Sequence, residues 1–192
     1  MQTDTKTALL DSAEAAVRAR GFDGFSYADL SADVGIRKAS IHHHFPTKAA
    51  LAHALMMRYC EVLAEACTDI NAAHATGGAR LSAIIALYRE ASASGQQLCL
   101  CLSFATSPDR LPDGVKTLIV GFRQSVLDWL GSVFALGRSD GSIIGVIDDQ
   151  AEAAAAMAVL EGAQLACRVE EDITRFDIAI RQLSARARPA QG

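Results

Sequence analysis

Hydrophobic residues recur at spacings of three and four along almost the whole chain, which is the period of an amphipathic helix. Alternation of the kind found in strands occurs only at residues 142–147, which we interpret as a loop. The pattern therefore predicts an all-α fold of about nine helices. The predicted helices span residues 4–20, 29–34, 37–44, 48–73, 79–93, 97–106, 113–136, 148–167 and 172–186.

Residues 29–51 are the segment around which the rest of the chain is organised. Leu30 and Val34 are four residues apart and share one face of a short helix. Gly35 can adopt the left-handed conformation that ends a helix, and Pro46 ends the next one. The segment is therefore predicted to form two short helices joined by a tight turn.

The second short helix presents donors and small side chains outward, because Ile41 and Phe45 form its inner face. Such a helix fits the major groove of DNA and can hydrogen-bond to base edges. Thr47 is a good N-cap for the next helix, where free backbone amides and Lys48 can bind a phosphate. The predicted DNA-contacting residues are Arg37, Lys38, Ala39, Ser40, His42, His43 and Lys48.

This segment resembles the TetR/AcrR family of bacterial transcriptional regulators. The resemblance rests on residues 34–36, on Lys38 and on residues 43–48, and it covers about the first third of the chain. A first helix over residues 5–20, followed by Gly21 and Phe22, is also similar to that family. Three positions depart from the family pattern, where Ser, Gly and Tyr are frequent. In this chain they are Arg37, Ala39 and His42.

The resemblance implies a ligand-responsive repressor that binds a palindromic DNA operator as a homodimer and is released by an effector. It also implies that the last two helices of each subunit form the dimer interface. The C-terminal segment is consistent with such an interface, because an apolar stripe there follows an alanine-rich helix at residues 151–166. The predicted interface residues are Met157, Leu160, Ile173, Phe176, Ile180 and Leu183.

Charge is unevenly distributed along the 192 residues, although the total is only −4. Residues 1–60 carry a net charge of +1 and residues 61–192 carry −5. An acidic body behind a locally basic face is compatible with DNA binding. We therefore predict a helix-turn-helix DNA-binding domain at residues 1–47 and a regulatory ligand-binding and dimerisation domain at residues 48–192.

Aromatic residues and cysteines in the predicted regulatory domain are candidates for an effector cavity, although at helical spacing such residues are more often plain core. The candidate ligand-binding residues are Tyr59, Tyr88, Cys99, Cys101, Phe104, Phe122 and Trp129. Cys99 and Cys101 are either small buried hydrophobes or thiols that sense oxidants, electrophiles or a soft metal. No positive charge lies next to them in the sequence, which favours the buried interpretation.

Several other classes of function are not supported. Adjacent helical positions such as His42, His43 and His44 cannot converge on one metal ion. No nucleotide-binding, zinc or nucleophile-elbow motif occurs, so neither an enzyme nor a cofactor is predicted. The polar N-terminus, the odd number of cysteines and the lack of a long apolar run predict a cytoplasmic protein. The alternative is a helical small-molecule-binding protein or enzyme with a vestigial DNA-binding head.

Overall fold

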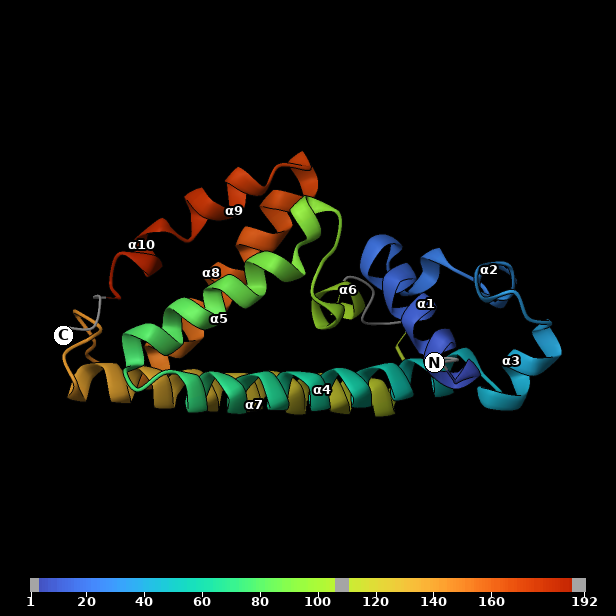
Figure 1. The fold of residues 1–192 in the computed structure, drawn as a ribbon, viewed down its shortest axis with the longest axis horizontal. Helices are drawn as coiled ribbons and strands as arrows, with labels where there is room; N and C mark the ends of the chain where they lie inside the picture. The colour runs from blue at the N-terminus through green and yellow to red at the C-terminus, as the bar shows by residue number, and fades with distance from the viewer. Residues whose placement is uncertain (1–3, 106–110, 188–192) are drawn as a thin grey trace. The chain divides into compact units, whose positions relative to one another are not determined.

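The computed structural model describes residues 4–105 and 111–187, and within these ranges the chain is helical (Figure 1). The only pairing of the strand type in the described ranges is an isolated bridge between Ile143 and Ala187. The predicted all-α class is therefore confirmed. The α-helices are α1 Thr5–Arg20, α2 Tyr27–Val34, α3 Lys38–His44, α4 Lys48–Ala73, α5 Gly77–Ala91, α6 Leu100–Ala105, α7 Asp113–Ser139, α8 Asp149–Glu170, α9 Ile173–Ala179 and α10 Arg181–Ser184. Two 3-10 turns are η1 Phe22–Gly24 and η2 Ala93–Gly95.

Most predicted boundaries lie within three residues of the observed ones, and α4 has the predicted bounds. The single helix predicted at residues 172–186 is wrong, because the helix is interrupted at Ile180, which separates α9 from α10. Phe176, Ile180 and Leu183 are all buried on either side of and at this interruption. The hydrophobic spacing is the same with or without a break, so the sequence pattern does not reveal it.

The chain forms two compact units, and the boundary between them falls inside α4 and α7. The first unit contains residues up to Glu61 together with residues 100–121, and the second contains residues 62–99 and those from Phe122 onward. The core of the first unit is built from α1, α3 and the start of α4, with Val17, Ile41 and Leu55 fully buried. In the second unit, Leu81, Leu130 and Leu160 come from α5, α7 and α8.

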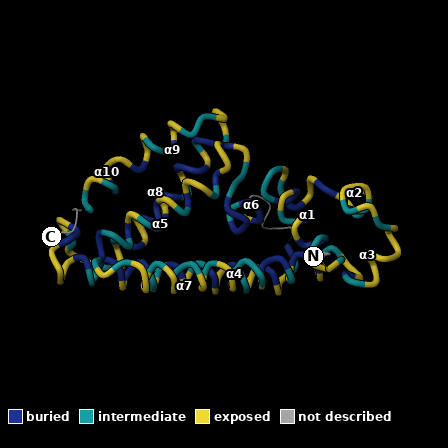
Figure 2. Tube along the Cα trace, viewed as in Figure 1, coloured by how far each residue is buried: buried dark blue, intermediate teal, exposed yellow. Residues whose placement is uncertain are grey.

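Helix α4 is buried only near its start (Figure 2). All of its buried residues lie between Leu51 and Met56. From Tyr59 to Ile70 the least exposed residues of α4, which include Leu63 and Cys67, are only half-buried. Its second half is therefore held less tightly than its first.

Two helices of the second unit approach each other very closely. A Cβ atom built on Gly77, the first residue of α5, would lie 2.3 Å from the backbone nitrogen of Gly137 on α7. The loop after α7 caps α5 at the same place. The backbone N–H of Gly77 donates to Asp140 at 2.9 Å, and that of Gly78 donates to the Ser142 hydroxyl at 2.7 Å.

A buried amide side chain links three segments of the second unit. Gln164 of α8 accepts a hydrogen bond from the backbone N–H of Cys99 at 3.1 Å and donates one to the Tyr88 carbonyl at 3.1 Å. Because a buried amide must satisfy both its donor and its acceptor, these bonds fix the segment that leads into α6 against α5 and α8.

Candidate nucleic-acid interface

Helices α2 and α3 form a helix-turn-helix, and its geometry follows from local sequence signals. Ser26 caps α2 in a capping box, with its backbone N–H donating to Asp29 at 2.7 Å. Gly35 ends α2 with φ +74°, a left-handed value that glycine adopts without strain. The Ser31 hydroxyl then donates to the carbonyl of Ile36 and fixes the turn. The chain thereby enters α3 in a defined direction.

Helix α3 is anchored on its inner side and exposed on its outer side. Ile41 is fully buried and Phe45 is 3% exposed, as their spacing predicted. The helix itself begins at Lys38, because Arg37 has an extended conformation and occupies the N-cap position. Six of the seven predicted DNA-contacting residues are exposed. They are Arg37, Lys38, Ala39, Ser40, His42 and His43.

Lys48 differs from those six because its ammonium group is engaged within the first unit. Its Nζ donates to the Phe25 carbonyl at 2.7 Å and lies 4.2 Å and 4.7 Å from the ring centroids of Phe25 and Phe22. Burial lowers the pKa of Lys48, and the charges of Asp23 and Asp29 oppose that shift. Sequence reasoning missed this contact, since the carbonyl it binds is 23 residues away.

His42 is held by two neighbouring groups although its side chain is exposed. Its Nδ1 lies 3.3 Å from the Pro46 carbonyl oxygen. The Tyr27 ring packs edge-on against its imidazole with a centroid distance of 4.9 Å. Tyr27 is itself fixed, because its hydroxyl donates to the Phe45 carbonyl at 2.8 Å. No cluster suited to a metal ion occurs among the described residues.

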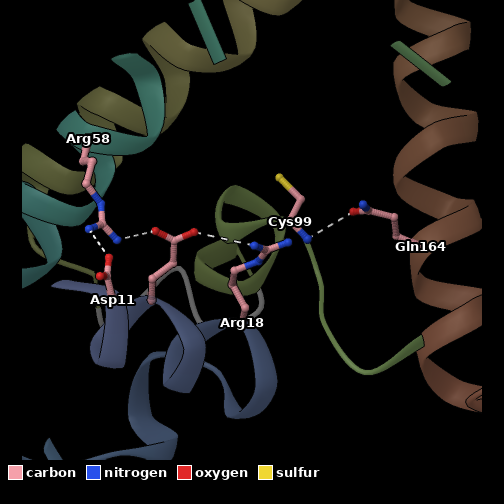
Figure 3. A network of polar contacts seen from close by, with 6 residues as sticks. Asp11, Arg18, Arg58, Cys99 and Gln164 are labelled. Atoms are coloured by element: carbon pink, nitrogen blue, oxygen red, sulfur yellow. Dashed lines mark hydrogen bonds and ion pairs between the residues drawn. The ribbon is translucent and has the colours of Figure 1, made fainter. Parts of the chain in front are cut away.

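Helix α4 is attached to α1 by a charged network (Figure 3). Arg58 donates to Asp11 at 2.6 Å and to Glu14 at 2.7 Å, and Arg18 lies 3.5 Å from Glu14. Arg58 and Glu14 are about three-quarters buried, so solvent screens their attraction less than at an open surface. In the sequence these residues look like ordinary surface charges, because 44 to 47 positions separate the partners.

The predicted ligand-binding residues are divided between the two units. Tyr59, Cys101 and Phe104 belong to the first, and the Phe104 ring packs 5.6 Å from that of Phe22. The second unit contains Tyr88, Cys99, Phe122 and Trp129. The indole N–H of Trp129 is buried and has no hydrogen-bond partner among the described residues.

Most of the predicted dimer-interface residues are buried inside the single subunit, and their role in an interface stays a prediction. Met157, Leu160 and Phe176 are at most 1% exposed, and Ile180 and Leu183 are below 10%. Ile173 is half-buried. The largest of these side chains fill the core of their own chain.

The exposed side of α8 is also apolar, and it consists mainly of small residues. Val169 is 82% exposed, Leu165 is 41% exposed, and a Cβ on Gly162 would meet nothing within 4 Å. The spacing of three and four keeps these residues on one stripe. We call this stripe the outer α8 face. It is formed by Ala151, Ala154, Ala155, Ala158, Val159, Gly162, Leu165 and Val169.

Three of the cysteines lie where burial disfavours the thiolate. Burial raises the pKa of Cys67 to about 11. Burial, supported by the charge of Glu61, also raises the pKa of Cys60, and burial raises that of Cys167. Cys99 and Cys101 are buried. Because the thiolate is the reactive form, the raised pKa values favour packing over sensing for Cys60, Cys67 and Cys167.

We expect Cys67 to react slowly with iodoacetamide in the folded protein. At pH 8 its alkylation should be about 100-fold slower than in the urea-unfolded chain, where a thiol titrates near 8.5. The folded pKa is raised, so the rate should keep rising with pH toward 11 while the unfolded rate levels off. Mass spectrometry of timed samples measures both rates, with Cys67→Ser as the assignment control. Fast modification at pH 7 would contradict the burial.

Residues 9–55 match a family described as "Bacterial regulatory proteins, tetR family". A search of curated proteins finds no match. Among the described residues, no helix is long and apolar enough to cross a membrane.

Many solved structures resemble the whole chain. A TetR-family transcriptional regulator from Agrobacterium tumefaciens is 29% identical with a TM-score of 0.90, and the match covers 96% of this chain and 98% of that one. A TetR regulator from Legionella pneumophila is 24% identical with a TM-score of 0.84, covering 98% and 100%. The reduced form of E. coli NemR is 21% identical with a TM-score of 0.80, covering 97% and 99%. The last two similarities concern the fold alone.

Proposed function

This chain belongs to the TetR family of bacterial regulatory proteins, and from that premise we propose that it is a ligand-responsive transcriptional repressor. It binds a palindromic DNA operator as a homodimer in the cytoplasm, and a small-molecule effector releases it. The observation that carries the proposal is α3, whose outer side offers donors from Lys38, Ser40 and His43 while Ile41 and Phe45 anchor its inner side. That arrangement suits insertion into a major groove.

The DNA-binding domain in this proposal is residues 1–47, and residues 48–192 form the regulatory domain. Arg37 and Lys38 supply positive charge, and Ser40 and His43 contact base edges. Ala39 leaves space for close approach of the helix to the groove. One head offers few base contacts, so two heads reading a palindrome are needed for specific affinity.

A second copy of the chain is proposed to dock on the outer α8 face. Small residues allow two helices to approach closely, and the exposed apolar side chains of Val159, Leu165 and Val169 gain from burial. The same face of a two-fold partner would pack against it, which makes the interface self-complementary. Ile173, which is half-buried, and Ile178, which is 51% exposed, extend the face onto α9.

The effector is proposed to bind in the regulatory domain and change the spacing of the two heads. Tyr88, Phe122 and Trp129 are the strongest candidates for contacting it, since Phe104 packs on Phe22 in the first unit. The unpaired indole N–H of Trp129 favours an effector that carries a hydrogen-bond acceptor. The raised pKa values of Cys60 and Cys67 favour an ordinary small molecule over a thiol-reactive one.

A gel-shift with DNA from upstream of the gene itself tests the function. We expect a sequence-dependent shift that weakens as salt rises, because phosphate contacts release counterions. An unrelated duplex of equal length is the control. A small-molecule-binding protein or enzyme with a vestigial head would shift neither duplex in a salt-sensitive, sequence-dependent way, and that result would refute the proposal.

Lys48→Ala should weaken operator binding by at least about tenfold, equally for all sequences, and flatten the salt dependence by about two units of slope, one for each subunit of the dimer. The ammonium has three donors, of which the Phe25 carbonyl uses one, so a phosphate can take another. Lys116→Ala, on an exposed position of α7, is the matched control. Weaker binding with an unchanged slope would mean that Lys48 acts only by holding Phe25.

A further inference from the structure

We propose that operator binding by this chain takes up protons at His42, so that affinity rises as pH falls from 8 toward 6. The inference rests on the proposed DNA-binding function and deepens it by naming a regulator of the same site. Its basis is the fixed orientation of the His42 ring on the exposed side of α3.

The contact with Pro46 determines which ring nitrogen carries hydrogen. A proline carbonyl can only accept, so a hydrogen bond at 3.3 Å requires a hydrogen on Nδ1 of His42. The Tyr27 ring packs against the imidazole and is itself held by the Phe45 carbonyl, so the ring is restrained from turning over. Nε2 is then the nitrogen available to DNA.

The neutral ring has the wrong hydrogen-bonding character for a phosphate. With its hydrogen on Nδ1, neutral imidazole presents only a lone pair at Nε2, and phosphate oxygens also only accept. The protonated ring presents an Nε2–H donor and a positive charge, so a phosphate contact requires imidazolium. Binding to the duplex therefore stabilises the charged ring, and the proton comes from solvent.

The groups around His42 provide no internal counter-charge. On its own helix, Lys38 lies one turn earlier and His43 and His44 follow it, and none of these side chains can form an anion. From α2, Tyr27 is neutral in this range because burial raises its pKa. Lys48 at the start of α4 directs its ammonium to Phe25.

Asp29 of α2 is committed to Ser26, and hydrogen bonds from the Ser26 side chain and backbone lower the pKa of that carboxyl. Across residues 4–105 and 111–187, no carboxylate forms an ion pair with His42. The DNA phosphates are therefore the counter-charge that protonation of His42 acquires on binding, which couples the two events.

Fluorescence anisotropy with a labelled operator tests this coupling at constant ionic strength between pH 6 and 8. We expect affinity to rise by about tenfold from pH 8 to 6.5, with up to two protons taken up per dimer. Calorimetry in buffers of different ionisation enthalpy counts those protons directly.

Two substitutions of His42 and one control identify the residue responsible. His42→Lys keeps a charge throughout, and His42→Gln cannot titrate, so both should lose the pH dependence whatever their absolute affinity. His53→Gln, on an exposed position of α4, should retain the wild-type dependence. Circular dichroism at each pH confirms that the variants are folded.

Each outcome of these binding measurements either supports or overturns the inference about His42. Sequence-specific binding with equal affinity at pH 6 and 8, or a dependence that survives His42→Lys, overturns the inference and leaves the proposed function intact. Affinity that falls on acidification also overturns it, since it would mean that neutral Nε2 accepts from a base. No sequence-specific binding at any pH overturns the proposed function and this inference together.

Discussion

Ala158→Glu should convert the dimer into monomers and reduce operator affinity by at least about 100-fold, because a dimeric repressor draws its specific affinity from two half-sites. Ala158 is exposed near the middle of the outer α8 face, next to Val159 and Gly162. In the monomer the glutamate faces water and costs little. In the dimer it would be an unpaired charge in a dry interface between closely packed helices, which is strongly unfavourable.

Light scattering measures the mass of the protein in solution, and fluorescence anisotropy measures its affinity for the operator. Ala72→Glu is the matched control, since it makes the same change at an exposed position near the end of α4. Its mass and operator affinity should equal those of the wild type. A stable Ala158→Glu dimer would show that a different surface holds the subunits together.

Gly77→Ala should lower the free energy of unfolding by about 2 to 3 kcal/mol, since over-packing a tight contact has costs of this size. Its Cβ would lie 2.3 Å and 2.4 Å from the backbone N and Cα of Gly137 and 2.6 Å from the Val133 carbonyl oxygen. Backbone cannot move aside as a flexible side chain does, so α5 would have to shift away from α7. That shift also weakens the hydrogen bonds that the backbone N–H groups of Gly77 and Gly78 donate to Asp140 and Ser142.

Gly121→Ala makes the same chemical change where there is room. A Cβ at Gly121 meets nothing within 4 Å, and alanine is favoured over glycine inside a helix by about 1 kcal/mol. This variant should therefore be slightly more stable than the wild type. Urea unfolding curves compare all three proteins. Equal midpoints for the two alanine variants would contradict the close approach of α5 and α7.

The features that can be predicted from the sequence alone depend on neighbours a few residues apart. The helix-turn-helix is one, because Gly35 ends α2 and the pair Ile41 and Phe45 sets the inner face of α3. The bounds of α4 are another, since Thr47 accepts a hydrogen bond from the Ala50 N–H at its start. Capping, turn formation and helical period are local interactions, so the order of residues is enough to predict them.

Local sequence patterns do not predict which of the two apolar faces of α8 lies inside the subunit. Both faces have helical spacing, and the larger residues Met157 and Leu160 suggested an interface. They fill the subunit core instead and leave the smaller residues outside, because burying larger side chains contributes more to folding. The sequence also does not reveal that Arg58 binds Asp11 or that Lys48 binds the Phe25 carbonyl. Such contacts depend on how distant segments pack together, which no local pattern encodes.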